Sequence, residues 1–452
     1  MIRRPAAPLV MLLALTACGS EADLDQTGPR PELPEVEQSL FPAINVAPPT
    51  GWEGALPSVP EGFAISPLAT DLKVPRQILV LPNGDILVAE GSGGGAPKIR
   101  PKDVIAGIIK SKGKSKTEGG DRITLIRDRD RNGVAELQTV FIEGLDAPYG
   151  LAMVGSELFV ANQDALLAFP YQEGQTQITA PAREVAKLPS ELNHHWTKAL
   201  TASPDGAFLY VGIGSNSNIM ERGPEAEVGR AMVWEVDRET GAHRPFATGL
   251  RNPTALAFHP ETGELWAAVN ERDELGGNLV PDYITSVREG AFYGWPYSYW
   301  GNNVDPRVRP QKPELVRTAV APDYAVGSHV APLGIAFSGA GLTWPGFANG
   351  AFVGMHGSWN RSTPSGYKVV WIPFSGGRPA GEPRNLVTGF LDGDGNARGR
   401  PVGVTVDPLG NALLIADDLS NTVWRVTPAG AAPGPAPSPS PSPNSPPAPE
   451  GA

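Results

Sequence analysis

Two adjacent histidines, His194 and His195, are the residues of this sequence best suited to proton transfer. They stand in the run NHHWTKALTASPDG, directly before a stretch with the apolar residues and turn residues of a β-hairpin. A neutral imidazole accepts a proton near pH 7, so a histidine that precedes such a strand could act as a general base. The chain has only 6 histidines, so an adjacent pair here is more than a random surface pattern suggests. The alternative is an exposed pair in a loop.

A polar loop further along the chain suits a metal ion. This loop, residues 270–282, holds four carboxylates, at Glu271, Asp273, Glu274 and Asp282. Carboxylates and free carbonyls crowded in one short loop suit calcium, which takes about six to eight oxygen ligands. We therefore predict a calcium site formed by backbone carbonyls near Arg272 and Asp273, with help from Asp282.

A second run, DRDRNGVAE at residues 128–136, has the D-x-D-x-N-G spacing of a calcium-binding loop, with Gly133 at the sharp turn. An EF-hand would place a bidentate glutamate at loop position twelve, where this chain has Thr139. The run is therefore predicted to be a turn between strands that could hold a structural ion. A third acidic run, DGDGN at residues 392–396, is predicted to be a plain loop.

The elements that must position these residues are hairpins that repeat along the chain. Each copy has a Pro or Gly, an apolar strand, a Pro/Asp/Gly turn and a second strand that ends on a polar residue. Six copies begin at residues 74, 147, 195, 251, 330 and 399. This repetition predicts an all-β fold, a six-bladed β-propeller with four-stranded antiparallel blades. A β-sandwich would not explain six similar hairpins.

The hairpin motifs also resemble a known family. The run RNPTALAFHPETGELW…VNERDELG…PDY…FYGWPYSYWG, with HWTKALTASPDG, SHVAPLG, HGSWNRSTPSGYKVV and GRPVGV, resembles the glucose/sorbosone dehydrogenase family of soluble quinoproteins. The likeness covers about residues 60–427 and is closest to the sorbosone dehydrogenase branch. It implies a propeller that binds pyrroloquinoline quinone (PQQ) and calcium. It also implies oxidation of a sugar, aldose or aldehyde, sorbosone-like or glucose-like, with electrons passed to an external acceptor such as a cytochrome or a quinone.

The resemblance implies roles for single residues. The family's general base is a histidine before KALTASPDG, and the alignment places His195 there. Arg251 would reach a quinone oxygen and stabilise the negative charge that develops on it, with Asn252 beside the cofactor. Arg398 and Arg400 would form the paired guanidiniums that suit the carboxylates of PQQ. Each arginine could instead form an ordinary ion pair.

Two further residues are expected to contact cofactor or substrate. These are His329, in GSHVAPLG, and Arg361, which follows His356 in MHGSWNR; the alternative is ordinary packing at the rim. Glucose-specific members of the family carry a glutamine, a lysine and a threonine where this chain has Pro148, Arg361 and His329. These departures leave the identity of the sugar open.

The termini indicate export. Residues 1–17 combine two arginines with a short apolar run, which is too short to span a bilayer and is typical of a signal peptide. The segment LTAC resembles a bacterial lipobox, which implies that Cys18, the only cysteine, carries lipid. The expected location is the bacterial cell envelope, facing the periplasm or on the cell surface; the alternative is a plain secretory signal with an incidental cysteine.

The composition divides the rest of the chain into three parts. Residues 18–58 are rich in Pro, Glu and Ala and are predicted to form a disordered tether. Residues 59–428 are predicted to form the propeller, and residues 429–452 a Pro/Ser-rich disordered tail.

The charge of the chain argues against nucleic acid as a partner. The formal net charge is −11, and no domain-wide basic face is expected. One basic run, residues 98–116, is predicted to be a solvated loop or, alternatively, a docking patch for an acidic electron acceptor or lipid headgroups. The expected partners are a small sugar or aldehyde, an external electron acceptor, and a membrane reached through the lipid anchor alone.

Two other functions fit a propeller. One is calcium-dependent hydrolysis of a lactone or ester, which needs carboxylates that converge on one ion in the central tunnel. The other is a non-catalytic binding module, since a fold does not settle a function. Histidines and arginines at the expected strand mouths favour the quinone enzyme. No glycine-rich dinucleotide fingerprint stands between a strand and a helix, so a nicotinamide enzyme is not expected.

Overall fold

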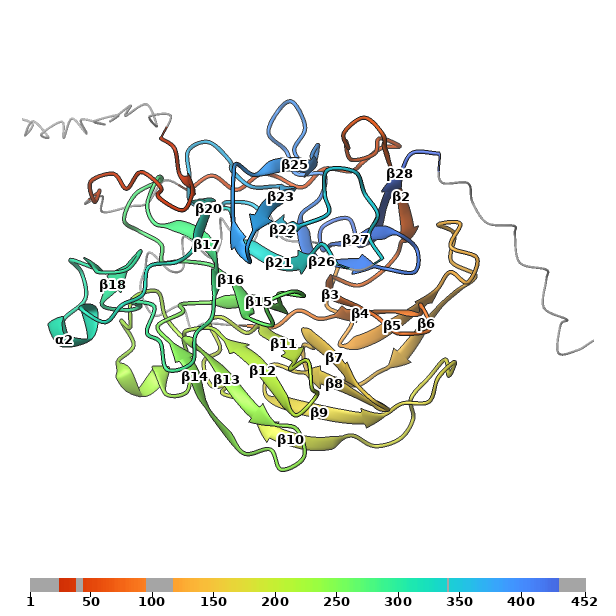
Figure 1. Ribbon diagram of the computed structural model, residues 1–452, viewed down its shortest axis with the longest axis horizontal. Coiled ribbons are helices and arrows are strands. Elements are labelled where there is room, and N and C mark those ends of the chain that lie inside the picture. Colours follow the sequence, from red (N-terminus) through yellow and green to blue (C-terminus); the bar gives the residue numbers. More distant parts are fainter. Residues whose placement is uncertain (1–23, 38–43, 95–116, 340, 431–452) are drawn as a thin grey trace, which may run out of the picture.

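The fold is built almost entirely from β-strands. The computed structural model describes residues 24–37, 44–94, 117–339 and 341–430. Six antiparallel sheets surround one central axis (Figure 1), and the first strand of each sheet contacts the first strand of the next, so the ring closes. The predicted six-bladed β-propeller with four-stranded blades is confirmed.

Each blade runs from an innermost strand beside the axis to an outermost strand at the rim. Blade one contains β3 (Pro75–Val80), β4 (Ile86–Glu90), β5 (Arg122–Arg127) and β6 (Leu137–Ile142). Blade two contains β7 (Gly150–Val154), β8 (Glu157–Ala161), β9 (Ala165–Pro170) and β10 (Arg183–Lys187). Blade three contains β11 (Lys198–Ala202), β12 (Phe208–Ile213), β13 (Met232–Asp237) and β14 (His243–Thr248).

The other three blades complete the ring, and two of them take in a strand from the N-terminal side of the chain. Blade four contains β15 (Pro253–Phe258), β16 (Leu265–Val269), β17 (Pro281–Ser286), β20 (Tyr324–Ser328) and, at its edge, β1 (Thr27–Gly28). Blade five contains β21 (Pro332–Phe337), β22 (Gly350–Met355), β23 (Lys368–Ser375), β24 (Arg378–Pro379) and β25 (Arg384–Val387). Blade six contains β26 (Pro401–Asp407), β27 (Ala412–Asp417), β28 (Thr422–Pro428) and β2 (Phe63–Ala69). Outside the blades lie the short pair β18 (Ser298–Tyr299) and β19 (Asn303–Val304), α2 (Pro313–Val316) and a 3-10 turn at Pro224–Glu227.

The hydrophobic core lies between neighbouring blades. Six clusters of buried residues each join two consecutive blades. Strand β4 illustrates the cause, because successive side chains of a strand point to opposite faces of the sheet. Leu87 and Ala89 pack toward blade two, whereas Ile86 and Val88 pack toward blade six. Burial between blades leaves the axis itself as a channel that other side chains can line.

The two ends of the propeller domain close the ring. Strand β2, from the N-terminal side, pairs with β28, the last strand of the domain, so that Phe63 lies opposite Pro428. Blade six therefore contains three strands from one end of the chain and one from the other. Hydrogen bonds between sequence-distant strands hold this joint together.

Residues 24–37 and 44–58 differ from the predicted disordered tether. Strand β1 pairs with β20, and the ring of Trp52 packs edge-on against Phe390 and Trp424, at centroid distances of 5.6 and 5.2 Å. The physical reason is that a few apolar side chains among the prolines find buried surface on the blades, and average composition does not register them.

Four predictions fall on residues outside the described part of the chain. These are the signal peptide of residues 1–17, the lipid site at Cys18, the basic run at 98–116 and the tail beyond residue 430. They stay predictions. Within the described ranges, no helix has the length and apolar character needed to cross a membrane.

Candidate functional site

A polar cavity of about 300 Å³ lies at one end of the central channel. Its walls come from the segments that precede the inner strands of blades three, four and five and from those that follow the second strands of blades four and five. The lining residues are His194, His195, Arg251, Asn252, Asn270, Glu271, Asp273, Asp282, His329, Ala331, Leu333, His356, Gly357, Trp359 and Asn360. Six of the predicted site residues are among them: His195, Arg251, Asn252, Asp273, Asp282 and His329.

A second cavity, of about 330 Å³, lies further along the inner strands of all six blades and contains no titratable side chain. Hydrogen bonds between inner strands separate the two cavities. Gln77, which lines the second cavity, donates to the hydroxyl of Tyr149 at 3.1 Å and to the carbonyl of Leu333 at 2.8 Å. The Tyr149 hydroxyl in turn donates to the carbonyl of Thr254 at 3.0 Å, and Leu333 lines the polar cavity. The titratable side chains that line these two cavities are therefore all at the polar end.

The hydrogen bonds of His195 determine its tautomer. Its Nδ1 lies 2.7 Å from the carbonyl oxygen of Ser215, and a carbonyl only accepts, so Nδ1 carries the proton. Nε2 is then the atom with a free lone pair. Burial lowers the pKa of His195 well below its usual 6.5, and the charges of Arg251 and His194 lower it further. A neutral imidazole that is held in one tautomer is the state required of a general base.

Arg251 is both buried and ion-paired. Its Nη2 donates to Asp273 Oδ2 and to Asn218 Oδ1, each at 3.0 Å, and its Nη1 donates to the carbonyl of Glu271 at 2.6 Å. These bonds fix the guanidinium at the cavity wall, and Asp273 compensates its charge. Its Nε is buried and has no acceptor among the described residues. The ion pair that was the alternative for Arg251 is present, and the cofactor role stays a prediction.

The loop between β16 and β17 brings carboxyl groups to the cavity. Asp282 accepts hydrogen bonds from the backbone N–H groups of Glu271 at 2.7 Å and Ala331 at 2.8 Å. Burial nevertheless raises the pKa of Asp282 to about 8 and that of Glu271 to about 7. Taking charged carboxylates out of water is costly, and a bound cation would remove that cost.

Several oxygen atoms at the cavity lack a donor. The Oδ1 atoms of Asn252, Asn270 and Asn360 are buried and have no hydrogen-bond partner in the described part of the chain. Amide and carboxyl oxygens together form the kind of donor set that calcium prefers. The unpaired Arg251 Nε offers a donor to an anionic quinone ligand. The residues present therefore fit both calcium and PQQ.

The side chain of Arg272 does not take part in this donor set. It turns away from the cavity and lies 2.9 Å from Asp305, and both side chains are almost completely buried. Only its backbone carbonyl was predicted as a ligand, and that prediction stays open. The buried ion pair joins the loop to the segment that contains β18 and β19.

Hydrogen bonds with Gly276 and Asn360 fix the positions of His329 and Asp273. The Nε2 atom of His329 lies 3.0 Å from the carbonyl of Gly276, which requires the proton on Nε2. Nδ1 of His329 then accepts from the amide of Asn360 at 3.1 Å. That amide also donates to Asp273 Oδ1 at 2.8 Å. The sequence analysis assigned no role to Asn360, because this residue lies beyond the end of a strand in an irregular segment.

Three predicted arginines are not among the residues that line the cavity. Arg361 donates to Asn278 Oδ1 at 2.8 Å and lines a different cavity beside β1. Arg400 donates to Asp418 at 3.0 Å. The backbone N–H of Arg398 donates to the carbonyl of Phe390 at 2.8 Å. The cofactor contacts predicted for these three arginines stay predictions.

Asp418 links Arg400 to the cavity wall. It lies 2.9 Å from Arg76 and 3.1 Å from His356, which lines the cavity. Burial alone would raise the pKa of Asp418, but the charges of Arg400, His356 and Arg76 hold it far below its usual range. The sequence signal for this cluster was present: Asp418 and His356 each follow the second strand of a repeated hairpin.

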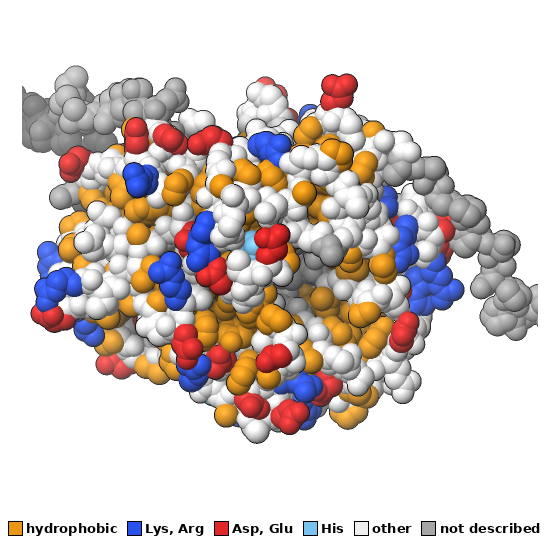
Figure 2. All heavy atoms as spheres, viewed as in Figure 1, with side chains coloured by type: hydrophobic (Ala, Val, Ile, Leu, Met, Phe, Trp, Pro, Cys, Tyr) orange, Lys and Arg blue, Asp and Glu red, His pale blue; other side chains and the backbone are white. Residues whose placement is uncertain are grey.

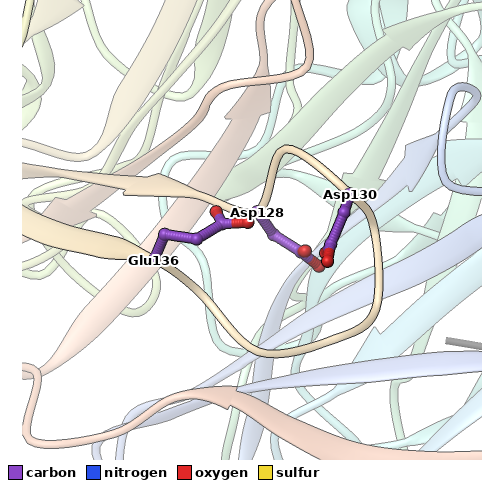
Figure 3. A group of neighbouring side chains, drawn as sticks. All are labelled: Asp128, Asp130 and Glu136. Carbon is purple, nitrogen blue, oxygen red and sulfur yellow. The ribbon is translucent and has the colours of Figure 1, made fainter. Parts of the chain in front are cut away.

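The run at residues 128–136 forms the turn between β5 and β6 (Figure 3). Asp128, Asp130 and Glu136 each offer an oxygen within 4.8 Å of the others, and theirs is the one such group of three acidic or histidine ligands found in the described ranges. Asp128 accepts from the N–H of Gly133 at 2.9 Å and from that of Asn132 at 3.1 Å. The predicted turn is confirmed, and the ion stays a prediction.

The chain was compared with protein families and with curated proteins, and it matches both. A protein-family model described as TrAA12-like matches residues 57–288 and 311–429. A curated protein of Coprinopsis cinerea, a pyrroloquinoline quinone-dependent pyranose dehydrogenase, is 24% identical over 427 residues, which cover 81% of this chain and 54% of that protein. The chain spans about half the length of the curated relatives that it matches.

Two solved structures share the fold. The holo form of the pyranose dehydrogenase PQQ domain from Coprinopsis cinerea has a TM-score of 0.65 at 21% identity, covering 86% of this chain and 100% of that one. The calcium structure of a Trichoderma reesei carbohydrate-active enzyme of family AA12 has a TM-score of 0.65 at 20% identity, covering 87% and 99%.

Proposed function

Because the chain belongs to the TrAA12-like family, we propose that it is a PQQ- and calcium-dependent dehydrogenase that oxidises a sugar, aldose or aldehyde. Family membership bears out the resemblance to soluble quinoprotein sugar dehydrogenases; the sorbosone branch belongs to the proposal alone. The observation that supports the proposal best is the polar cavity. There, His195, Arg251 and an oxygen-rich loop meet from different blades.

The residues at the cavity divide into two groups by chemistry. Arg251, Asn252 and His329 would hold the quinone, and oxygens of the 270–282 loop, including Asp282, would hold calcium. When bound, PQQ would take up the carbon-bound hydrogen of the substrate together with its electron pair, and calcium would supply a positive charge that favours this uptake. The Nε–H of Arg251 is aimed by the three hydrogen bonds on its other nitrogens and can stabilise negative charge on an oxygen.

His195 supplies the base. Its Nε2 accepts the proton of the substrate hydroxyl, while the Ser215 carbonyl holds Nδ1–H and keeps the ring in place. The imidazolium formed in this way carries a positive charge, which the buried surroundings disfavour. That charge makes the proton leave readily once the substrate is oxidised. Electrons pass to an external acceptor, such as a cytochrome or a quinone.

Metal-assisted hydrolysis is less well supported by the geometry. It needs three carboxylate or histidine ligands that converge on one ion in the channel. In the described ranges, the one such group lies in the β5–β6 turn of blade one and not in the polar cavity.

Reconstitution tests the proposed function. The purified protein is titrated with PQQ and calcium, binding is followed by the absorbance of the quinone, and turnover is followed by dye reduction with a panel of sugars and aldehydes. We expect stoichiometric quinone binding and dye reduction with at least one aldose or sorbosone-like compound. Binding without turnover would point to the non-catalytic binding module, and absence of binding would overturn the proposal.

We further propose that the protein is exported and held at the bacterial cell envelope by lipid on Cys18. The apolar run that ends in LTAC and the single cysteine support this. Changing Cys18 to Ser should release the protein from the membrane fraction of its native host or a bacterial expression host. A Cys18→Ser protein that still sediments with membranes in high salt would contradict the anchor.

On the face drawn in Figure 2, acidic and basic side chains are interspersed, and none of the described regions visible there is of one sign over a wide area. The polar cavity at the end of the channel has the size of a small-molecule site, and this size agrees with a sugar as the substrate.

A further inference from the structure

Two buried cations lie behind the turn that carries His194 and His195. Lys198, the first residue of β11, is completely buried, and Arg230, just before β13, is 4% exposed. In the described part of the chain, neither forms an ion pair with a carboxylate. Burying a charge without a counter-ion is costly, so such groups are retained where their position has a use.

Both cations bind the same amide oxygen. The Nζ of Lys198 donates to Asn193 Oδ1 at 3.3 Å and to the carbonyl of Trp196 at 3.0 Å. Arg230 donates to Asn193 Oδ1 at 3.2 Å and to the carbonyls of Pro189 at 2.8 Å and Glu191 at 3.3 Å. Residues 189–196 form no regular secondary structure, so these bonds define their path.

Arg230 also reaches the opposite side of the His195 ring. It donates to the carbonyl of Gly214 at 3.2 Å, and the next residue, Ser215, accepts the Nδ1 proton of His195. Gly214 is closely packed, since a Cβ there would lie 2.6 Å from the Cβ of His195. One guanidinium therefore binds both the turn that carries the imidazole and the residue that precedes the orienting carbonyl of Ser215.

The charges around His195 are mostly positive. Arg251, His194 and Arg230 face it, and each disfavours a proton on its ring. Glu227 lies near Arg230, but its carboxylate accepts from the N–H of Asn216 and from the Ser217 hydroxyl. Burial and the Arg230 charge hold the pKa of Lys198 itself well below its usual range, with Asp164 opposing them. Arg230 is therefore the cation of this pair that acts on His195 by charge, and Lys198 acts by its bond to Asn193.

We propose that Arg230 and Lys198 are positioning residues for the base: together they fix the 189–196 turn with His195 Nε2 toward the cavity, and Arg230 adds a positive charge near that imidazole. The inference rests on the proposed role of His195. It adds a function for two residues that do not line the cavity.

The test follows the His195 ring in the cofactor-free protein by histidine NMR, with the signal assigned from His195→Gln. In the wild type we expect a single Nδ1–H tautomer and a titration midpoint below 6.5. Arg230→Gln should raise the midpoint by roughly half to one pH unit, because a positive charge near the ring is lost. Arg230→Lys should keep the midpoint low, because it keeps the charge.

Lys198→Met serves as the comparison variant, and Lys187→Met, at an exposed residue of β10, serves as the control. Lys198→Met should move the midpoint less than Arg230→Gln but should give a mixture of tautomers, because one donor to Asn193 is lost. Lys187→Met should match the wild type. In dye reduction, the acid limb of the pH profile should move upward with the midpoint in Arg230→Gln.

The same midpoint and the same single tautomer in wild type, Arg230→Gln and Lys198→Met would overturn the inference. If Arg230→Gln does not fold, Arg230→Lys and Lys198→Met still decide it through the tautomer signal. Shifted NMR signals in a protein that reduces no dye would contradict the proposed function while leaving the positioning role intact. Dye reduction with unchanged NMR signals would support the proposed function and contradict the positioning role.

Discussion

Replacing His195 with Gln should lower kcat by about a hundredfold to ten-thousandfold, the range that general bases contribute. The imidazole is neutral, fixed as the Nδ1–H tautomer by the Ser215 carbonyl, and lines the cavity with Nε2 available. Glutamine keeps a polar group of similar size but cannot take the proton. Steady-state dye reduction with saturating PQQ and calcium measures the loss, and quinone titration should show binding unchanged.

His194→Gln is the matched control for this prediction. The two rings pack edge to face, with centroids 4.6 Å apart, so both changes perturb the same surroundings. Only His195 has the Ser215 contact that fixes its tautomer, so the His194 variant should lose much less turnover. Equal turnover in wild type and His195→Gln would remove the proposed base. A large loss of turnover confined to His194→Gln would assign the role of general base to His194 instead.

The pH profile of the wild type follows from the same surroundings. Burial lowers the pKa of His195 well below 6.5. The active form is the neutral one, which persists at any pH above that lowered value. Activity should therefore remain high at pH 6.5 and fall only in more acidic solution.

Removing calcium with a strong chelator should abolish quinone-dependent dye reduction, and added calcium should restore it. The loop between β16 and β17 presents carboxyl and amide oxygens to the cavity. Magnesium should restore activity poorly, because it requires a tight octahedron and gives up its water reluctantly. Activity that is indifferent to the chelator would contradict the proposed site.

Paired carboxyl-to-amide variants locate the calcium that matters. Asp282→Asn should raise the calcium concentration needed for half-maximal activity, because Asp282 lies at the cavity. Asp128→Asn makes the same chemical change in the β5–β6 turn, where a structural ion is predicted, and should leave that concentration unchanged. Calorimetric titration of the cofactor-free proteins provides a readout that does not depend on activity. A calcium requirement that follows Asp128 instead would place the essential ion in blade one.

The sequence by itself determined the architecture and the positions at which chemistry could occur. Repeated hairpins with polar residues at their ends specify six blades, because each strand's alternating side chains need a neighbouring blade on both faces. Residues that precede an inner strand must lie near the axis. For this reason His195, Arg251, Asn252 and His329 could be placed from the sequence, and the structure brings all four to one cavity.

The tertiary structure alone decided where long side chains point. The side chains of Arg361 and Arg400 bind Asn278 and Asp418, partners that lie 83 and 18 residues away in the chain. A flexible charged side chain takes the nearest buried partner, and contacts between blades determine which partner that is. Contacts between blades also explain why the N-terminal residues dock and why Arg230 forms hydrogen bonds with the turn that carries His195. Both depend on surfaces that exist only after the blades have assembled.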